Sequence, residues 1–235
     1  MTNLPSQSIL AQVMEATWPP FASCRLGPWR LRDGAGGGKR VSAATLESDW
    51  QVADIALAVA AMPQGPLFMI RPQDGALDTA LSDLGYRIVD PVLTYAAPIA
   101  QFAPPPRMTS FVHWPPLQIA VQLWAEAGIG PARLAVMDRA IGPKTALLAR
   151  QGDRAVGVAY VALHGQVAMV HALEVSPPHR RQGSAQNLLA AAAHWSKAQG
   201  ADTLGLAVTQ SNQPARTLYE RLGMVALGGY HYRQP

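Results

Sequence analysis

Cysteine is almost absent from this sequence, which has one, Cys24, in 235 residues. A single cysteine excludes an internal disulfide and a cysteine-based zinc site, and it fits a reducing compartment. The N-terminal residues contain no basic segment followed by an apolar run, so we expect no signal peptide. The sequence therefore favours a cytoplasmic location.

Long apolar runs and charge clusters are also scarce. The longest apolar run, near residues 55–62, is far too short to span a bilayer, so we expect no membrane association. Charged residues make up 14% of the chain, and the basic ones are largely scattered. We therefore expect no nucleic-acid partner, and a basic pocket for an anionic ligand explains the net charge of +4 equally well.

Apolar residues, in contrast, are abundant at 49%, which is enough for a sizeable core in one large domain or two small ones. Their periodicity predicts alternating helices and strands. The predicted helices lie at residues 6–16, 48–62, 76–84, 116–127, 131–140 and 213–222. A further helix opens at the turn 180–185 and has its apolar residues at helical spacing, namely Ala185, Leu188, Leu189, Ala192 and Trp195. The predicted strands lie at residues 28–33, 40–47, 67–71, 92–99, 145–150, 155–163, 167–175, 203–208 and 225–233.

A glycine-rich run at residues 34–39 ends in lysine, as a phosphate-binding loop does. Such a loop opens a helix, whereas the residues that follow here are strand-like. We therefore predict a hairpin turn that joins residues 28–33 to residues 40–47.

Two features divide the chain. Residues 101–110 contain three consecutive prolines and form the best linker, because such a run fits neither a helix nor a central strand. Residues 81–98 are similar to residues 218–235, since each has a helix end, a Leu-Gly stop and an extended segment with aromatics. The similarity indicates two related halves, although a match this short also arises by chance.

The central feature is the turn between the strand at 167–175 and the helix that follows. Its sequence, Arg180 to Ala185, is basic and contains Gly183 among small residues. Successive backbone amides at a helix N-terminus form a site for an anion such as a diphosphate. The alternative is an ordinary solvated helix cap with two arginines.

The second feature is the segment 211–223. Asn212 or Gln213 can cap a helix there, and Gly223 ends it. Tyr219 lies on the same helix face as Leu218 and Leu222. Periodicity alone favours core packing for this tyrosine.

Together, these segments resemble the GNAT superfamily of acetyl-CoA-dependent N-acetyltransferases. The resemblance rests on the Arg-x-x-Gly-x-Ala turn, the next strand, Asn212 and the Leu-Tyr pair, and it covers residues 145–235 well. It implies an α/β fold with a mixed, mostly antiparallel sheet flanked by helices. Residues 1–100 resemble a degenerate copy, which predicts two GNAT-like halves with the catalytic domain at 108–235.

The resemblance also implies how acetyl-CoA is held. Amides of the turn would bind the CoA pyrophosphate, and the preceding strand would pair with the pantetheine arm through its main chain. Asn212, which follows the next strand, would contact the pantetheine arm or orient the helix at 213–222. The implied cofactor-binding residues are Leu173, Val175, Arg180, Arg181, Gln182, Gly183, Ser184, Ala185, Asn212 and Tyr219.

Catalysis requires an acid and a base. Tyr219 would protonate the thiolate, which is a poor leaving group without a proton, while a base removes a proton from an ammonium with a pKa of about 10. Many relatives carry a glutamate two residues before His171, where this chain has Met169. His171 is the first candidate base, and a satisfied core histidine is its alternative. Glu174 is the second, but it faces the other way unless the strand bulges.

The sequence therefore predicts an N-acetyltransferase that moves an acetyl group from acetyl-CoA to a primary amine of a small molecule or peptide. No metal is expected, because no His-x-x-x-His pair lies in a predicted helix. The alternative is an acyl-CoA-binding sensor or scaffold without turnover, which Met169 favours. The protein would be a monomer or a homodimer.

Overall fold

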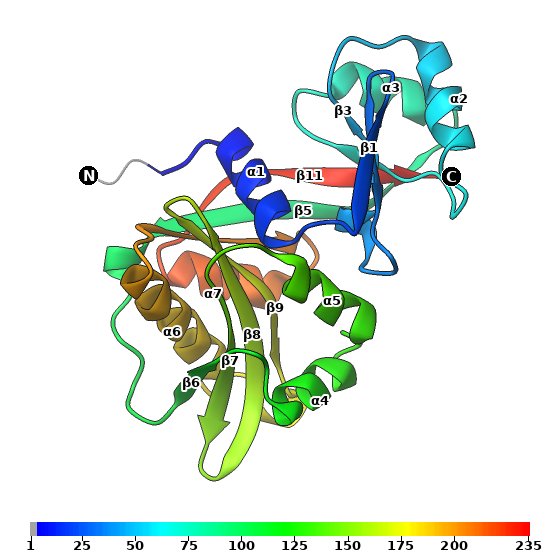
Figure 1. Ribbon diagram of the computed structural model, residues 1–235. Coiled ribbons are helices and arrows are strands. Elements are labelled where there is room, and N and C mark those ends of the chain that lie inside the picture. The colour runs from blue at the N-terminus through cyan, green and yellow to red at the C-terminus, as the bar shows by residue number, and fades with distance from the viewer. Residues whose placement is uncertain (1–3) are drawn as a thin grey trace.

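The computed structural model describes residues 4–235, and within them eight strands form one mixed sheet in the order β4-β11-β5-β10-β9-β8-β7-β6 (Figure 1). A smaller antiparallel sheet has the order β1-β2-β3. The strands are β1 (Ala22–Leu26), β2 (Trp29–Asp33), β3 (Thr45–Leu46), β4 (Phe68–Ile70), β5 (Arg87–Pro98), β6 (Ser110–His113), β7 (Lys144–Gln151), β8 (Arg154–His164), β9 (Val167–Val175), β10 (Thr203–Thr209) and β11 (Val225–Gln234).

Helices cover both faces of the large sheet (Figure 1). One face packs against α6 and α7, and the other packs against α1, α4 and α5, while α2 and α3 lie with the small sheet. The α-helices are α1 (Gln7–Thr17), α2 (Val52–Ala60), α3 (Gly75–Asp83), α4 (Gln118–Glu126), α5 (Pro131–Arg139), α6 (Ser184–Ala198) and α7 (Gln213–Arg221). This arrangement confirms the predicted α/β class with a mostly antiparallel sheet.

Strand β5 crosses from the first half of the chain into the sheet of the second half. It pairs antiparallel with β10 on one side and with β11 on the other. The units β4-α3-β5 and β10-α7-β11 have the same element order, and their last strands are exchanged, since β11 also pairs with β4. The segments 81–98 and 218–235, which are similar in sequence, thus lie side by side.

The glycine-rich run leads into a short 3-10 helix, Lys39–Val41, and only then into β3. The predicted strand at 40–47 is therefore wrong in its first part, although β2 and β3 do pair. Gly37 is required here, because a Cβ atom would lie 2.5 Å from Val136 of α5. The run lets the chain pass close to α5, and Val41 is then fully buried against the same core.

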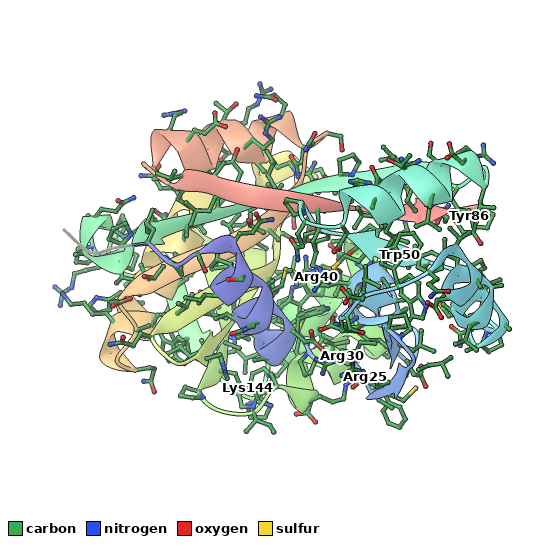
Figure 2. The ribbon with its side chains drawn as sticks, turned by 90° about the horizontal axis from the view of Figure 1, so that it is seen from above. Arg25, Arg30, Arg40, Trp50, Tyr86 and Lys144 are labelled. Atoms are coloured by element: carbon green, nitrogen blue, oxygen red, sulfur yellow. The ribbon has the colours of Figure 1, made fainter. Side chains whose placement is uncertain are left out.

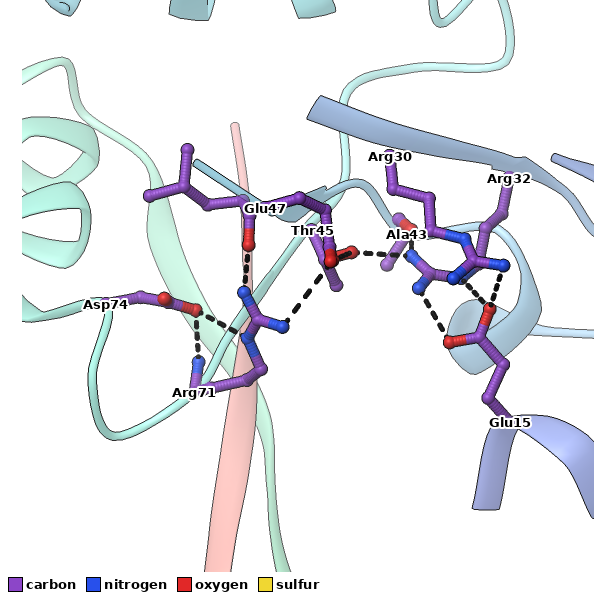
Figure 3. A network of polar contacts seen from close by, with 9 residues as sticks. Glu15, Arg30, Arg32, Ala43, Thr45, Glu47, Arg71 and Asp74 are labelled. Atoms are coloured by element: carbon purple, nitrogen blue, oxygen red, sulfur yellow. Dashed lines mark hydrogen bonds and ion pairs between the residues drawn. The ribbon is translucent and has the colours of Figure 1, made fainter. Parts of the chain in front are cut away.

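A polar network fixes the chain that follows this 3-10 helix (Figure 3). Arg32 donates to the carbonyl oxygen of Ala43 at 3.0 Å and to Thr45 Oγ1 at 2.9 Å, and it also pairs with Glu15 of α1 at 2.9 Å. Glu15 has a second ion pair, with Arg30, at 3.1 Å. The network joins α1 to the small sheet and anchors residues 43–45.

None of the helices among residues 4–235 combines the length and the hydropathy needed to cross a membrane.

Candidate active site

The sheet opens between β9 and β10. The two strands pair in parallel from Thr203 opposite Val167 to Leu206 opposite Val170, and they separate beyond that point. A cavity of about 520 Å³ follows the opening and is lined by consecutive residues of both strands, 170–174 and 206–209. It is also lined by Tyr219 from the α7 face and by His171 from the α1 face, so it connects the two faces of the sheet.

A β-bulge sets the direction of the side chains in β9. Ala172 has a positive φ of 49°, and the register with β8 shifts between Tyr160 opposite His171 and Val158 opposite Glu174. Because the bulge inserts one extra residue, His171 and Glu174 point to the same face. Tyr160 and Val158 share one core cluster, in agreement with this direction, and both candidate bases line the cavity.

The turn after β9 carries unused backbone donors. Gly183, with φ of 87°, precedes α6, and Arg181 also has a positive φ, of 59°. None of the amides of residues 181–186 donates a hydrogen bond within the described chain, 4–235. The space beside Gly183 is open, since a Cβ atom there would have no neighbour within 4 Å. The corner predicted to hold a diphosphate is therefore neither filled by side chains nor occupied by carbonyl groups.

The other predicted cofactor residues surround this corner. Leu173 lines the cavity, and the carbonyl oxygen of Val175 accepts a hydrogen bond from Arg180 Nε at 3.0 Å. Arg180 is thus turned back toward β9. Gln182 Nε2 donates to Pro178, which stabilises the turn itself. Ser184 is buried, whereas residues 181–183 are exposed.

Helix α7 brings Asn212 and Tyr219 to the cavity. Asn212 caps the helix, because its Oδ1 accepts from the amide of Ala215 at 3.2 Å. The ring of Tyr219 packs 5.7 Å from that of Tyr95. Burial, followed by the charge of Glu174, raises the pKa of Tyr219 to about 12, so the phenol remains protonated at neutral pH.

His171 is buried with both ring nitrogens occupied. Arg40 Nη1 lies 3.2 Å from Nδ1, and Thr17 Oγ1 lies 2.8 Å from Nε2. Arginine can only donate, and the Thr17 hydroxyl donates to Val13, so these partners assign the proton to Nε2. Burial, followed by the Arg40 charge, lowers the pKa of His171 well below its ordinary value. The lone pair that a base needs is therefore held by Arg40.

Glu174, in contrast, is free to accept a proton. Its carboxylate makes no hydrogen bond or ion pair within residues 4–235, and it faces the cavity. Burial raises its pKa, although the charges of Arg180 and Arg133 oppose this shift. The geometry favours Glu174 over His171 as the base.

Comparison with known proteins agrees with this architecture. Residues 114–224 match the model of the Acetyltransferase (GNAT) family. The chain is 22% identical to "Uncharacterized N-acetyltransferase YobR" of Bacillus subtilis (strain 168), over 95% of this chain and 96% of that protein.

Solved structures show that the whole chain has the GNAT fold. A GCN5-related N-acetyltransferase from Kribbella flavida superposes with a TM-score of 0.70 at 17% identity, over 100% of this chain and 96% of that one. A tandem GNAT protein from the clavulanic acid biosynthesis pathway superposes with a TM-score of 0.61 at 14% identity, over 93% and 84% of the two chains.

Within the GNAT fold, the position of Met169 has a structural explanation. Met169 is fully buried in the core cluster beneath α1, together with Leu10. A Cβ atom on Gly205 would lie 2.7 Å from its sulfur, so the side chain fills the space left by that glycine. A glutamate here would be buried in an apolar core, which explains why the acid is absent from this position.

The sequence did not point to the residues that the first half of the chain contributes to this cavity. Arg40, from the 3-10 helix, and Trp18, at the end of α1, line the cavity. The Trp18 ring lies 5.0 Å from the His171 ring. Tyr230 of β11 completes this group, since its hydroxyl accepts from Arg40 Nε at 3.1 Å. The glycine run before Arg40 was the available signal.

Proposed function

We propose that this GNAT protein transfers an acetyl group from acetyl-CoA directly to a primary amine of a small molecule or peptide. The observation that carries the proposal is the row of free amides at residues 181–186, which follow the part of β9 that no longer pairs with β10. Amides at a helix N-terminus suit a diphosphate, and an open strand edge suits the amide-rich pantetheine arm.

The residues of the cavity match the proton transfers that this reaction requires. Glu174 would accept a proton from the acceptor ammonium, and the amine nitrogen would then attack the thioester carbonyl carbon. The carbon–sulfur bond breaks, and Tyr219 would donate its proton to the sulfur as it leaves. The nitrogen must then lose its second proton to become a neutral amide, and this proton would restore the phenol of Tyr219. Donor and acceptor would enter from opposite faces of the sheet, because the cavity joins both faces. Holding both reactants in line would supply much of the rate.

Substitution of Gln186 by glutamate tests the diphosphate site. Gln186 is exposed in the first turn of α6, and Gln186→Glu keeps the shape while adding a negative charge. A carboxylate in the first turn of α6 stabilises the helix through its dipole when no ligand is bound, but it repels a diphosphate. We expect an equal or slightly higher melting temperature and a CoA affinity lowered roughly tenfold in calorimetry.

Gln199→Glu at the other end of α6 is the matched control, and we expect its CoA affinity to equal that of the wild type. Equal CoA binding by the wild type and Gln186→Glu would contradict the proposed site. Free-thiol release from acetyl-CoA across a panel of amines tests turnover. CoA binding without thiol release for every amine would instead support the sensor or scaffold.

We further propose that residues 1–100 and 108–235 are two GNAT-like halves, of which the second is catalytic. The shared element order of β4-α3-β5 and β10-α7-β11 supports this, as does the fold similarity to a tandem GNAT protein. In this proposal the first half has kept the end of the fold and lost the diphosphate turn.

A further inference from the structure

Arg40 brings a positive charge into the cavity without a negative partner. Its guanidinium contacts the Tyr230 hydroxyl at 3.1 Å and His171 Nδ1 at 3.2 Å, and both partners are uncharged. No carboxylate lies within 4 Å of it in the described chain, residues 4–235. Burial lowers the pKa of Arg40, while Tyr232 also lies near enough to raise it, and like the other partners this tyrosine brings no negative charge. Arginine has five N–H donors, so these contacts leave donors for a ligand. A partly buried cation in this state is stabilised by an anion that enters the cavity.

The neighbouring charges also favour an anionic ligand in the cavity. Lys39 pairs with Asp90, so these two cavity residues neutralise each other. Arg133, at the exposed rim, makes no ion pair within residues 4–235. Glu174 is then the remaining acid of the cavity, and it becomes neutral when it accepts a proton. The cavity is therefore cationic at the moment when an amine has been deprotonated.

The placement of Arg40 shows that this charge belongs to the acceptor side. Arg40 contacts His171, whose ring lies beside Trp18 on the α1 face, whereas the free amides lie beyond β9 at the start of α6. Figure 2 shows Arg40 near the middle of the molecule, while Arg25 and Lys144 lie toward its edge. The network around Glu15 and Arg32 anchors the chain that follows the Arg40 segment, so the guanidinium is held in advance of binding.

We propose that the acceptor is an amino acid, whose carboxylate binds Arg40 while its amino group faces Glu174. This assignment rests on the proposed acetyl transfer and names its substrate class. The two opposite charges of a zwitterion match the charges of Arg40 and Glu174, which face the cavity without an ion-pair partner in residues 4–235. A simple amine would bring a second positive charge and leave Arg40 without a partner. A guanidinium recognises a carboxylate through paired N–H donors, which gives geometric selectivity as well as charge.

The test compares three forms of each acceptor: α-amino acids, their amides and their decarboxylated amines. Thiol release from acetyl-CoA should give kcat/KM values roughly 10- to 100-fold higher for the acids. Arg40→Gln should remove this preference by raising the KM for the acids. The kcat/KM values for the amides and the affinity for CoA should stay within about threefold of the wild type. Arg40→Lys keeps the positive charge but lacks the planar guanidinium with its paired N–H donors, so it should keep part of the preference for acids. It should also fold if Arg40→Gln does not.

Arg30→Gln is the matched control, because Arg30 lies outside this cavity and pairs with Glu15. Equal rates for acids and amines with the wild type, or a preference for acids that survives in Arg40→Gln, would overturn the amino-acid inference and leave the proposed acetyl transfer standing. If no acceptor is acetylated, the proposed acetyl transfer is wrong. Ligand binding then tests separately whether Arg40 forms a carboxylate site. With CoA present, N-acetyl amino acids should raise the melting temperature more than their amides do, and an equal shift would overturn the carboxylate site.

Discussion

The hydroxyl group and the ring of Tyr219 have different contacts, so their roles can be tested separately. The ring packs against Tyr95, whereas the hydroxyl has no hydrogen-bond partner in residues 4–235. Tyr219→Phe should therefore fold normally and bind CoA normally, yet lower kcat roughly 100-fold or more, because the leaving thiolate loses its acid. Steady-state thiol release and a melting curve check both expectations. Tyr95→Phe, which removes a hydroxyl bonded to Glu220, is the control, and a fully active Tyr219→Phe would contradict the acid role.

His171 predicts how stability depends on pH. Burial holds the pKa of His171 well below 6.5, so the unfolded chain takes up a proton at this group before the folded chain does. Its contribution to stability is present above about pH 6.5 and is lost as the pH falls toward the folded pKa, by at most about 1.4 kcal/mol per unit.

Urea unfolding at about pH 7 and about pH 5.5 measures this effect. His171→Gln should flatten the dependence, while the same change at the exposed His164 should leave it as in the wild type. An equally steep loss of stability in His171→Gln would show that other groups are responsible.

Residue types could be predicted at this scale better than residue directions. The sequence predicted a CoA site from Tyr219 and residues 180–185, and the structure places Tyr219 in the cavity between β9 and β10 and residues 180–185 in the turn after β9. It could not assign the direction of Glu174, because one bulged residue at Ala172 reverses the alternation that follows. Arg40 was missed because residues 40–47 were predicted as a strand, whereas Arg40 lies in a short 3-10 helix in which side chains do not alternate.

Strands β8 and β9 are held together at Gly157, which lies opposite Val175. A Cβ atom there would meet the carbonyl oxygen of Glu174 at 2.8 Å, and backbone cannot move aside as a flexible side chain can. Gly157→Ala should therefore lower the free energy of unfolding by roughly 1–3 kcal/mol and weaken CoA binding, since it displaces the strand edge at Leu173–Val175. Denaturant unfolding and calorimetry measure the two effects.

Gly75→Ala is the matched control for this prediction. Gly75 opens α3 with an ordinary φ, and a Cβ atom there would meet nothing within 4 Å. The change should be neutral or stabilise the protein by up to about 1 kcal/mol. If Gly157→Ala behaved like Gly75→Ala, the close approach of β8 and β9 would not constrain the site.

At the scale of elements, periodicity predicted the helices and long strands and failed where elements are short. Strands β1 and β6 were missed, because a segment of four or five residues gives little alternation. The helix predicted from residue 48 begins later, at Val52, and the carboxylate of Asp54 accepts a hydrogen bond from the Gln51 amide at 2.8 Å. This contact between Gln51 and Asp54 marks the helix start.

At the scale of the whole molecule, the sequence identified β5 but could not place it. Its residues were predicted as the last strand of the first half, whereas they lie between β10 and β11 of the second half. Alternation tells which residues of a strand face the core, but the choice of partner strands depends on contacts distant in sequence. The similarity between residues 81–98 and 218–235 was the one sequence signal related to this exchange.

The exchange predicts that the two parts of the chain depend on each other. Cutting the exposed linker between residues 104 and 105 leaves β5 in one fragment and its partners β10 and β11 in the other. Co-expressed fragments should purify together and bind CoA, because β5 pairs with both partners along most of its length. Fragment 105–235 alone should aggregate, since the loss of β5 exposes the edges of two apolar strands at the middle of the sheet. A monomeric, CoA-binding 105–235 fragment in size-exclusion chromatography and calorimetry would show instead that this fragment closes its sheet without β5.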